Sequence, residues 1–338
     1  MTTQSNTTPI RQPATASAGV AECSGRELSY DAFLHEFVAQ NKPVVVHDAV
    51  PQWPALHKWT PAYFRGRFAS KMVNIERWKQ LSFADFIDQA EASTLEKPGP
   101  YMYRLFLHEH LPEVLPDLAP QSAYSFPRRY ASPMMPARWR RPDGYQKLLF
   151  GGVGGRFPVT HFDADNAHAT VTEIYGDKEF ILFPPGDSPF MYASPLQPNF
   201  SLVKDPLNPD LVGFPLFAKA TRYRTVLRPG DMVFVPCGWW HTARALSMSI
   251  SVGMNILDRS NWNGFVSEVS RGPASPRSNA RKIYLTGLGH ALSAMERVQE
   301  SLPSVAAALA LPKRLAPASS AVAADPALRP LRIRFPTA

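Results

Sequence analysis

The sequence contains very little cysteine. Only two cysteines, Cys23 and Cys237, occur among 338 residues. This number cannot build a disulfide framework and favours a reducing compartment. Long apolar runs are also missing, because no stretch approaches the roughly 18 residues of a membrane span. The N-terminus likewise lacks the apolar core of about 7–15 residues that marks a secretory signal. We therefore expect a cytoplasmic protein with no membrane partner.

Acidic residues are fewer than basic ones. Asp and Glu number 28 against 36 Lys and Arg, which gives a net charge of +8. This balance admits nucleic acid, acidic proteins or small anions as partners without choosing among them. Residues 128–147 hold six Lys or Arg against one Asp. This segment is either a docking surface for such a partner or a solvated basic loop. We favour the second interpretation, so nucleic acid is not the expected partner.

The apolar content of 45% is sufficient for the core of one large domain or two small ones. Residues 1–25 and 312–338 are rich in small polar residues and proline without periodicity, and we predict both to be disordered tails. Between them we expect one globular domain over residues 26–260, with a barrel core at about 146–258. A helical region is expected over residues 261–311.

Helical patterns frame the expected barrel. Residues 29–40 have apolar side chains at helical spacing. Residues 60–69 and 82–92 open with Thr60 and Ser82, which are suitable N-caps. Residues 281–301 carry Leu285, Leu288, Leu292 and Met295 in a narrow stripe. That stripe predicts either a helix–helix seam, hence a possible homodimer, or one helix packed on the barrel.

Short strand patterns dominate the middle of the chain. Earlier strands are expected at residues 42–50 and 101–107. From about residue 146 the strand patterns become dense and are separated by turn residues, at 145–152, 168–176, 178–187, 221–236 and 245–257. Many short strands with frequent turns are typical of a sandwich or barrel.

A metal-ligand pattern lies within this region. His161 and Asp163 are two residues apart, so on a strand they point to the same face. His241 is predicted to end an aromatic strand that a small barrel can bring alongside. Two imidazoles and one carboxylate form a facial triad suited to Fe(II), and a catalytic zinc site also uses this set. The His-x-Asp pair alone is common by chance, and the interpretation depends on the third ligand.

Lys178 begins an apolar strand, "KEFILF". Lysine is rarely buried without a partner, so this position favours either an anion inside the barrel or a solvated strand end.

The segments "THFD", "YGDKEFILFPP" and "RPGDMVFVPCGWWHTARALSMSISVGMN" resemble the JmjC, or cupin-like, branch of the Fe(II)- and 2-oxoglutarate-dependent oxygenases. That branch includes asparaginyl and lysyl hydroxylases. The resemblance covers about residues 146–258, with a looser match at "KPVVVHDAVPQWPAL". It implies a double-stranded β-helix, or jelly roll, with a helical N-terminal extension and C-terminal helices.

The resemblance also implies roles for individual residues. His161, Asp163 and His241 match the iron ligands, and Lys178 matches the lysine that pairs with the far carboxylate of 2-oxoglutarate. Further cosubstrate contacts are implied for Asn255, for Thr170 or Thr172, and for Tyr103 or its neighbour Tyr101. The sequence departs from many members at Pro158, where they have threonine.

The implied activity is hydroxylation of a C–H bond in a peptidyl side chain or an amino-acid-like small molecule, with Fe(II), 2-oxoglutarate and O2. Two alternatives stay open. One is a metal-dependent cupin enzyme that does not use 2-oxoglutarate, and the other is a non-catalytic barrel that acts as a binding module. Lys178 and Asn255 favour the oxygenase over the first alternative, and the complete ligand set favours it over the second.

Overall fold

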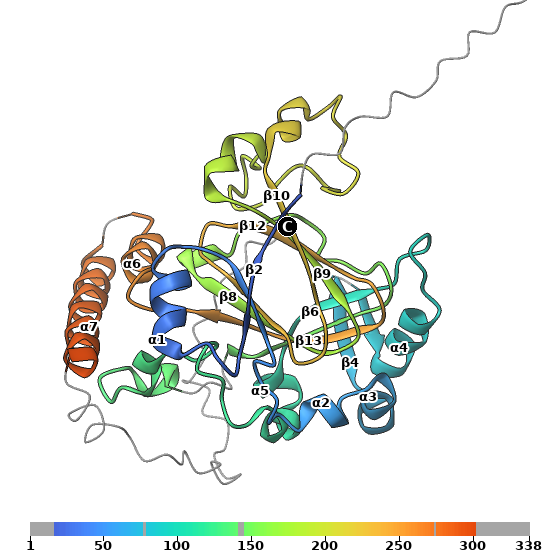
Figure 1. Ribbon diagram of the computed structural model, residues 1–338, viewed down its shortest axis with the longest axis horizontal. Helices are drawn as coiled ribbons and strands as arrows, with labels where there is room; N and C mark the ends of the chain where they lie inside the picture. Colours follow the sequence, from blue (N-terminus) through green and yellow to red (C-terminus); the bar gives the residue numbers. More distant parts are fainter. Residues whose placement is uncertain (1–16, 77–78, 141–144, 274, 302–338) are drawn as a thin grey trace, which may run out of the picture.

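The computed structural model describes residues 17–76, 79–140, 145–273 and 275–301. Its centre is a pair of β-sheets (Figure 1). The smaller sheet has the order β1 (Ser17–Gly19), β10 (Arg222–Leu227), β9 (Lys178–Phe183) and β12 (Trp240–Ala245). The larger has the order β2 (Ala21–Ser24), β3 (Val44–His47), β11 (Met232–Val235), β8 (His168–Tyr175), β13 (Ser249–Ile256), β7 (Lys147–Gly151) and β6 (Tyr101–Phe106). A separate hairpin pairs β4 (Met72–Glu76) with β5 (Lys79–Ser82).

The two sheets pack face to face. One apolar cluster joins Val45, Ala169 and Val233 of the larger sheet to Phe180 and Leu182 of the smaller. Side chains that alternate along these strands fill the space between the sheets, as in a jelly roll. The predicted double-stranded β-helix with helical additions is therefore confirmed.

The N-terminal segment differs from the prediction. Residues 17–24, expected within a disordered tail, form β1 and β2. β1 pairs in parallel with β10, and β2 pairs in parallel with β3. The order comes from backbone hydrogen bonds at two sheet edges, which a side-chain pattern does not reveal. Residues 1–16 and the predicted tail at 312–338 lie outside the described residues.

The N-terminal extension covers the outer face of the larger sheet with short helices. These are α1 (Tyr30–Phe33), which continues as the π-helical turn η1 (Leu34–Val38), α2 (Ala55–Lys58), α3 (Pro61–Phe68), α4 (Phe83–Glu91) and α5 (Leu107–His110). The predicted caps are confirmed. Thr60 Oγ1 accepts from the Tyr63 amide at 3.1 Å, and Ser82 Oγ accepts from the Asp85 amide at 3.0 Å. Phe33, Phe64 and Phe86 of these helices join Phe150 and Phe234 in one core.

Residues 184–220, between β9 and β10, form a separate cover over the outer face of the smaller sheet. Figure 1 shows this segment as the yellow-green loops at the top. It contains the 3-10 helices η7 (Pro185–Phe190) and η8 (Pro215–Lys219). Met191 and Phe217 from this segment pack on Phe183 and Trp240 of the sheet. Further 3-10 turns occur at η2 (Pro112–Leu118), η3 (Arg128–Ala131), η4 (Ala137–Trp139) and η6 (Ala164–Asn166).

The C-terminal region has two helices, α6 (Trp262–Val269) and α7 (Pro276–Ser301). The leucine stripe of α7 is buried against Tyr130, Trp139 and Trp262 of the same chain. Arg129, from the predicted basic loop, is fully buried and holds both carboxylate oxygens of Glu296 on α7, at 2.9 and 2.7 Å. The described part of the stripe thus packs within the chain. No helix in the described ranges is long and apolar enough to cross a membrane.

Candidate metal centre

Two histidines face each other at one end of the barrel. The His161 amide donates to the His241 carbonyl at 3.0 Å, and the His241 amide donates back to the His161 carbonyl at 2.6 Å. This isolated bridge brings the two rings to a centroid separation of 4.4 Å. Residues distant in the sequence therefore become direct cross-strand neighbours.

The place of His241 corrects a prediction. His241 does not end the strand that carries Phe234; it is the second residue of the next strand, β12. β11 ends at Val235, Pro236 has no amide hydrogen to continue a ladder, and Gly238 adopts a φ of +79° in the turn. His168 steadies this turn, because its Nδ1 accepts from the Cys237 amide at 2.9 Å.

Asp163 completes a three-residue cluster. One ligand atom from each of His161, Asp163 and His241 lies within 4.8 Å of the others, and this is the one such group among the described residues. His241 Nε2 is 3.7 Å from Asp163 Oδ2. The three predicted ligands therefore do come together.

Backbone carbonyls set the orientation of both rings. His161 Nδ1 lies 3.2 Å from the Val159 carbonyl, and His241 Nδ1 lies 3.0 Å from the Trp239 carbonyl. A carbonyl can only accept, so each Nδ1 carries the hydrogen, and in the neutral ring Nε2 then keeps its lone pair. Metal-binding histidines usually have an outer partner of this kind, which fixes the tautomer and the ring plane.

The charge states agree with metal binding. Burial, together with the neighbouring His241, lowers the pKa of His161 to about 3, so this ring is neutral. Burial by itself raises the pKa of Asp163. The effects of His241, His161, Lys147 and a hydrogen bond from Asn255 lower this pKa by more than burial raises it, so the net shift is downward. A neutral imidazole and an ionised carboxylate are the forms that a metal requires. Two nitrogens and one oxygen on one side of a site fit Fe(II), and also fit zinc.

A pocket of about 780 Å³, including its open mouth, leads to the cluster. Phe157, Phe180 and Phe200 form apolar walls, and Phe157 stacks on the His161 ring at 4.1 Å. Lys147 is the one Lys or Arg among the lining residues that the structure describes.

The predicted cosubstrate residues separate into two groups. Asn255, Thr170, Tyr101 and Tyr103 line the pocket, whereas Thr172 and Lys178 are not among the lining residues. Thr170 Oγ1 already donates to Ser125 Oγ at 3.1 Å.

Lys178 lies behind the pocket wall and is fully buried. Its amine contacts Ser251 Oγ and lies 3.6 Å from Glu173 Oε2. Glu173 is also fully buried and accepts from Ser249 Oγ at 2.7 Å and Ser251 Oγ at 2.8 Å. Burial raises the pKa of Glu173 to about 7, although Lys178 and the two serines oppose this shift.

The sequence interpretation missed the role of Lys147, which it placed at the end of the basic segment 128–147 and within the expected strand 145–152. It is the first residue of β7, is buried, and donates from Nζ to Asn255 Oδ1 at 2.5 Å. Burial lowers the pKa of this amine to about 8, against a smaller opposing effect of Asp163. The signal available in the sequence was its place directly before the strand residues "LLFG".

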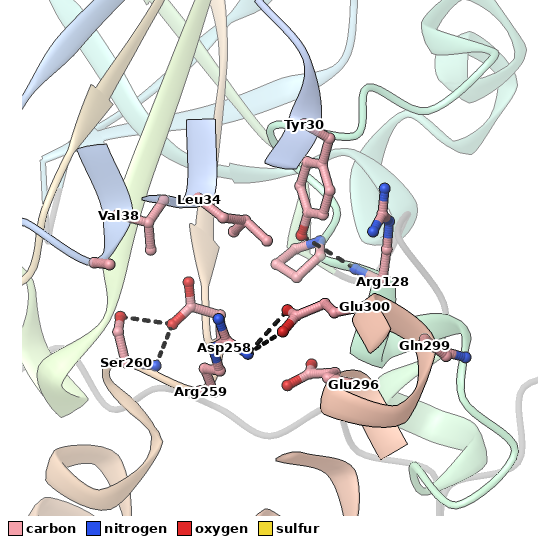
Figure 2. Close-up of a pocket in the computed structure, with 12 residues that line it drawn as sticks. Tyr30, Leu34, Val38, Arg128, Asp258, Arg259, Ser260, Glu296, Gln299 and Glu300 are labelled. Carbon is pink, nitrogen blue, oxygen red and sulfur yellow. Dashed lines mark hydrogen bonds and ion pairs between the residues drawn. The ribbon is translucent and has the colours of Figure 1, made fainter. Parts of the chain in front are cut away.

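A second cavity lies between η1, the segment after β13, and α7 (Figure 2). The charged groups that line it have partners within the chain. Arg259 holds both carboxylate oxygens of Glu300 at 2.9 Å, and Ser260 Oγ donates to Asp258 at 2.6 Å. The contact between Arg259 and Glu300 joins α7 to the segment that follows β13.

The comparison with known families agrees with this geometry, because the model of the cupin-like domain matches residues 30–263. The chain belongs to the cupin-like domain family. The match includes the N-terminal helices, the barrel and all three members of the metal cluster.

This cupin-like chain is similar to several curated proteins of the JmjC group. It is 27% identical to the human "Bifunctional peptidase and (3S)-lysyl hydroxylase JMJD7", over 65% of this chain and 78% of that protein. It is 28% identical to "Lysine-specific demethylase 8" of Danio rerio, over 66% of this chain and 55% of that protein. It is 26% identical to "tRNA wybutosine-synthesizing protein 5" of Gallus gallus, over 80% of this chain and 86% of that protein.

Proposed function

We propose that this protein is an Fe(II)- and 2-oxoglutarate-dependent oxygenase. The observation that carries the proposal is the orientation of the triad: both histidine Nε2 atoms are held at the Asp163 carboxylate by backbone acceptors on the opposite side of each ring. The similarity to proteins named as hydroxylases and demethylases supports it.

The chain's own residues supply position and shielding. His161, Asp163 and His241 would hold the metal and leave other coordination positions toward the pocket. Phe157 and Phe200 limit water at the His161 side. When bound, iron supplies the activation of O2 that converts substrate C–H and 2-oxoglutarate into substrate C–OH, succinate and CO2.

The substrate class is a peptidyl side chain or an amino-acid-like small molecule. The pocket has aromatic walls and an open mouth, which suits a side chain inserted from outside. The names of the relatives extend from lysyl residues to a modified tRNA base, so the class is a proposal from pocket shape. The expected cytoplasmic location and the possible homodimer stay predictions.

A second candidate has support from one observation. Lys178, expected to pair with the far carboxylate of 2-oxoglutarate, has Glu173 as a partner inside the barrel. This pairing favours a metal-dependent cupin enzyme that does not use 2-oxoglutarate.

Titration of 2-oxoglutarate into anaerobic, Mn(II)-loaded protein separates the two candidates. The oxygenase binds 2-oxoglutarate only with the metal present, and His161→Ala loses both metal and cosubstrate binding. His35→Ala is the matched control, because its exposed ring also bonds a backbone carbonyl through Nδ1, at 2.8 Å. Metal uptake without 2-oxoglutarate binding in the wild type would instead establish the second candidate.

A further inference from the structure

Two lysines are buried inside the barrel, and they occupy different surroundings. Lys178 and Glu173 are both 0% exposed, and Glu173 has two serine donors besides the lysine. Lys178 is therefore paired with Glu173, and both side chains are enclosed behind the pocket wall. Lys147 instead belongs to the pocket lining together with the metal cluster.

Asn255 connects Lys147 to the metal end of the pocket. Its Oδ1 accepts from Lys147 Nζ at 2.5 Å, and its side chain helps to lower the pKa of Asp163. The positive charge of Lys147 acts on both Asp163 and His161. Lys147 therefore stands one side chain away from a metal ligand.

The chemistry of an oxo acid fits this position. A 2-oxo acid chelates a metal through its keto oxygen and the adjacent carboxylate, so that carboxylate lies at the metal end. An ammonium group donates up to three hydrogen bonds, and a charge-assisted bond to a carboxylate is stronger than a neutral one. The pocket that contains the metal cluster offers this cation, whereas Lys178 lies outside the lining.

We propose that Lys147 binds the metal-side carboxylate of the oxo acid cosubstrate. The inference depends on the proposed oxygenase function and adds a specificity residue to it. Lys147 then selects for an acid group beside the metal, independently of what lies at the far end of the cosubstrate.

The test compares two ligands on anaerobic, Mn(II)-loaded protein. Dissociation constants for 2-oxoglutarate and pyruvate are measured by calorimetry, since pyruvate has only the metal-side carboxylate. Lys147→Met is expected to weaken both ligands by about 10- to 100-fold, the effect of losing one charge-assisted hydrogen bond. Mn(II) affinity, followed by electron paramagnetic resonance, should change by less than about threefold.

Two further variants distinguish charge from structure. Lys147→Gln keeps a donor for Asn255 without the charge, and it should lose affinity as Lys147→Met does. The double variant Lys178→Met/Glu173→Gln removes the other buried lysine with its carboxylate, and pyruvate binding should stay within about threefold of wild type.

Each contrary result has a defined meaning. Unchanged binding of both ligands in Lys147→Met, or wild-type affinity in Lys147→Gln, overturns the assignment while the oxygenase proposal stands. A loss confined to 2-oxoglutarate moves the contact to the distal carboxylate and overturns the metal-end assignment. If the metal-loaded wild type binds neither ligand, the oxygenase proposal fails, and the role of Lys147 fails with it.

Discussion

Lys178 and Lys147 are two buried lysines of one barrel, but they face different neighbours. Lys178 lies beside the carboxylate of Glu173, with two serines that complete the group. Lys147 donates to the neutral amide of Asn255 and lines the pocket. Burial of a cation therefore does not by itself identify a binding residue. What matters is whether the buried cation lines a space that a ligand can enter, as Lys147 does and Lys178 does not.

The largest effect that this comparison predicts is on folding. Lys178→Met leaves Glu173 as an uncompensated buried acid, and we expect the free energy of unfolding to fall by about 3–5 kcal/mol. Urea denaturation measures it. The double variant Lys178→Met/Glu173→Gln should recover most of the loss, because no buried charge remains. A double variant as unstable as the single one would show that the ion pair is not the cause.

The Lys178–Glu173 pair also predicts that the free energy of unfolding depends on pH. The pKa of Glu173 is raised from its ordinary 4.5 to about 7 in the folded protein. Between these values the folded state binds more protons than the unfolded state, so this group's contribution to stability falls as the pH rises. Lys178 opposes the upward shift, and its removal extends the fall to higher pH. Lys178→Met should therefore lose less stability at pH 5 than at pH 8, by urea denaturation at each pH. An equal loss at both values contradicts the proposed protonation of Glu173.

The smallest effect on folding is expected for Lys147. Lys147→Met removes the donor to Asn255 Oδ1 but also removes a buried charge, so the loss should be about 1–2 kcal/mol. The same urea experiment measures it beside Lys178→Met. A loss as large as that of Lys178→Met would show that Lys147 has a mainly structural role, and the contrast between the two lysines would disappear.

The sequence predicted features that depend on residues near one another in the chain. The caps at Thr60 and Ser82 depend on near neighbours, and the structure has them as predicted. His161 and Asp163 do join one metal cluster, but not as two residues of a strand: His161 forms isolated bridges, and Asp163 directly precedes η6. The jelly roll itself followed from strand density and from the resemblance.

The features that the sequence did not reveal depend on pairing between distant segments. Lys147 enters the pocket because β7 pairs with β13, opposite Gly253 and near Asn255. Glu173 and Lys178 are close in the sequence, but their contact depends on the chain passing from the larger sheet at β8 to the smaller sheet at β9. No local pattern encodes such a contact, and the position of β12 depended in the same way on the turn at Gly238.

The first two strands have a practical consequence for handling the protein. β1 and β2 bind different sheets and are separated by Val20, which is buried in the cluster between the sheets. This short N-terminal segment therefore covers one edge of each sheet. Trimming the protein to begin at Gly25 would bare the edges of β10 and β3 together, and bare edges recruit strands from other molecules. A short N-terminal truncation, harmless by composition, would therefore make the protein prone to aggregation.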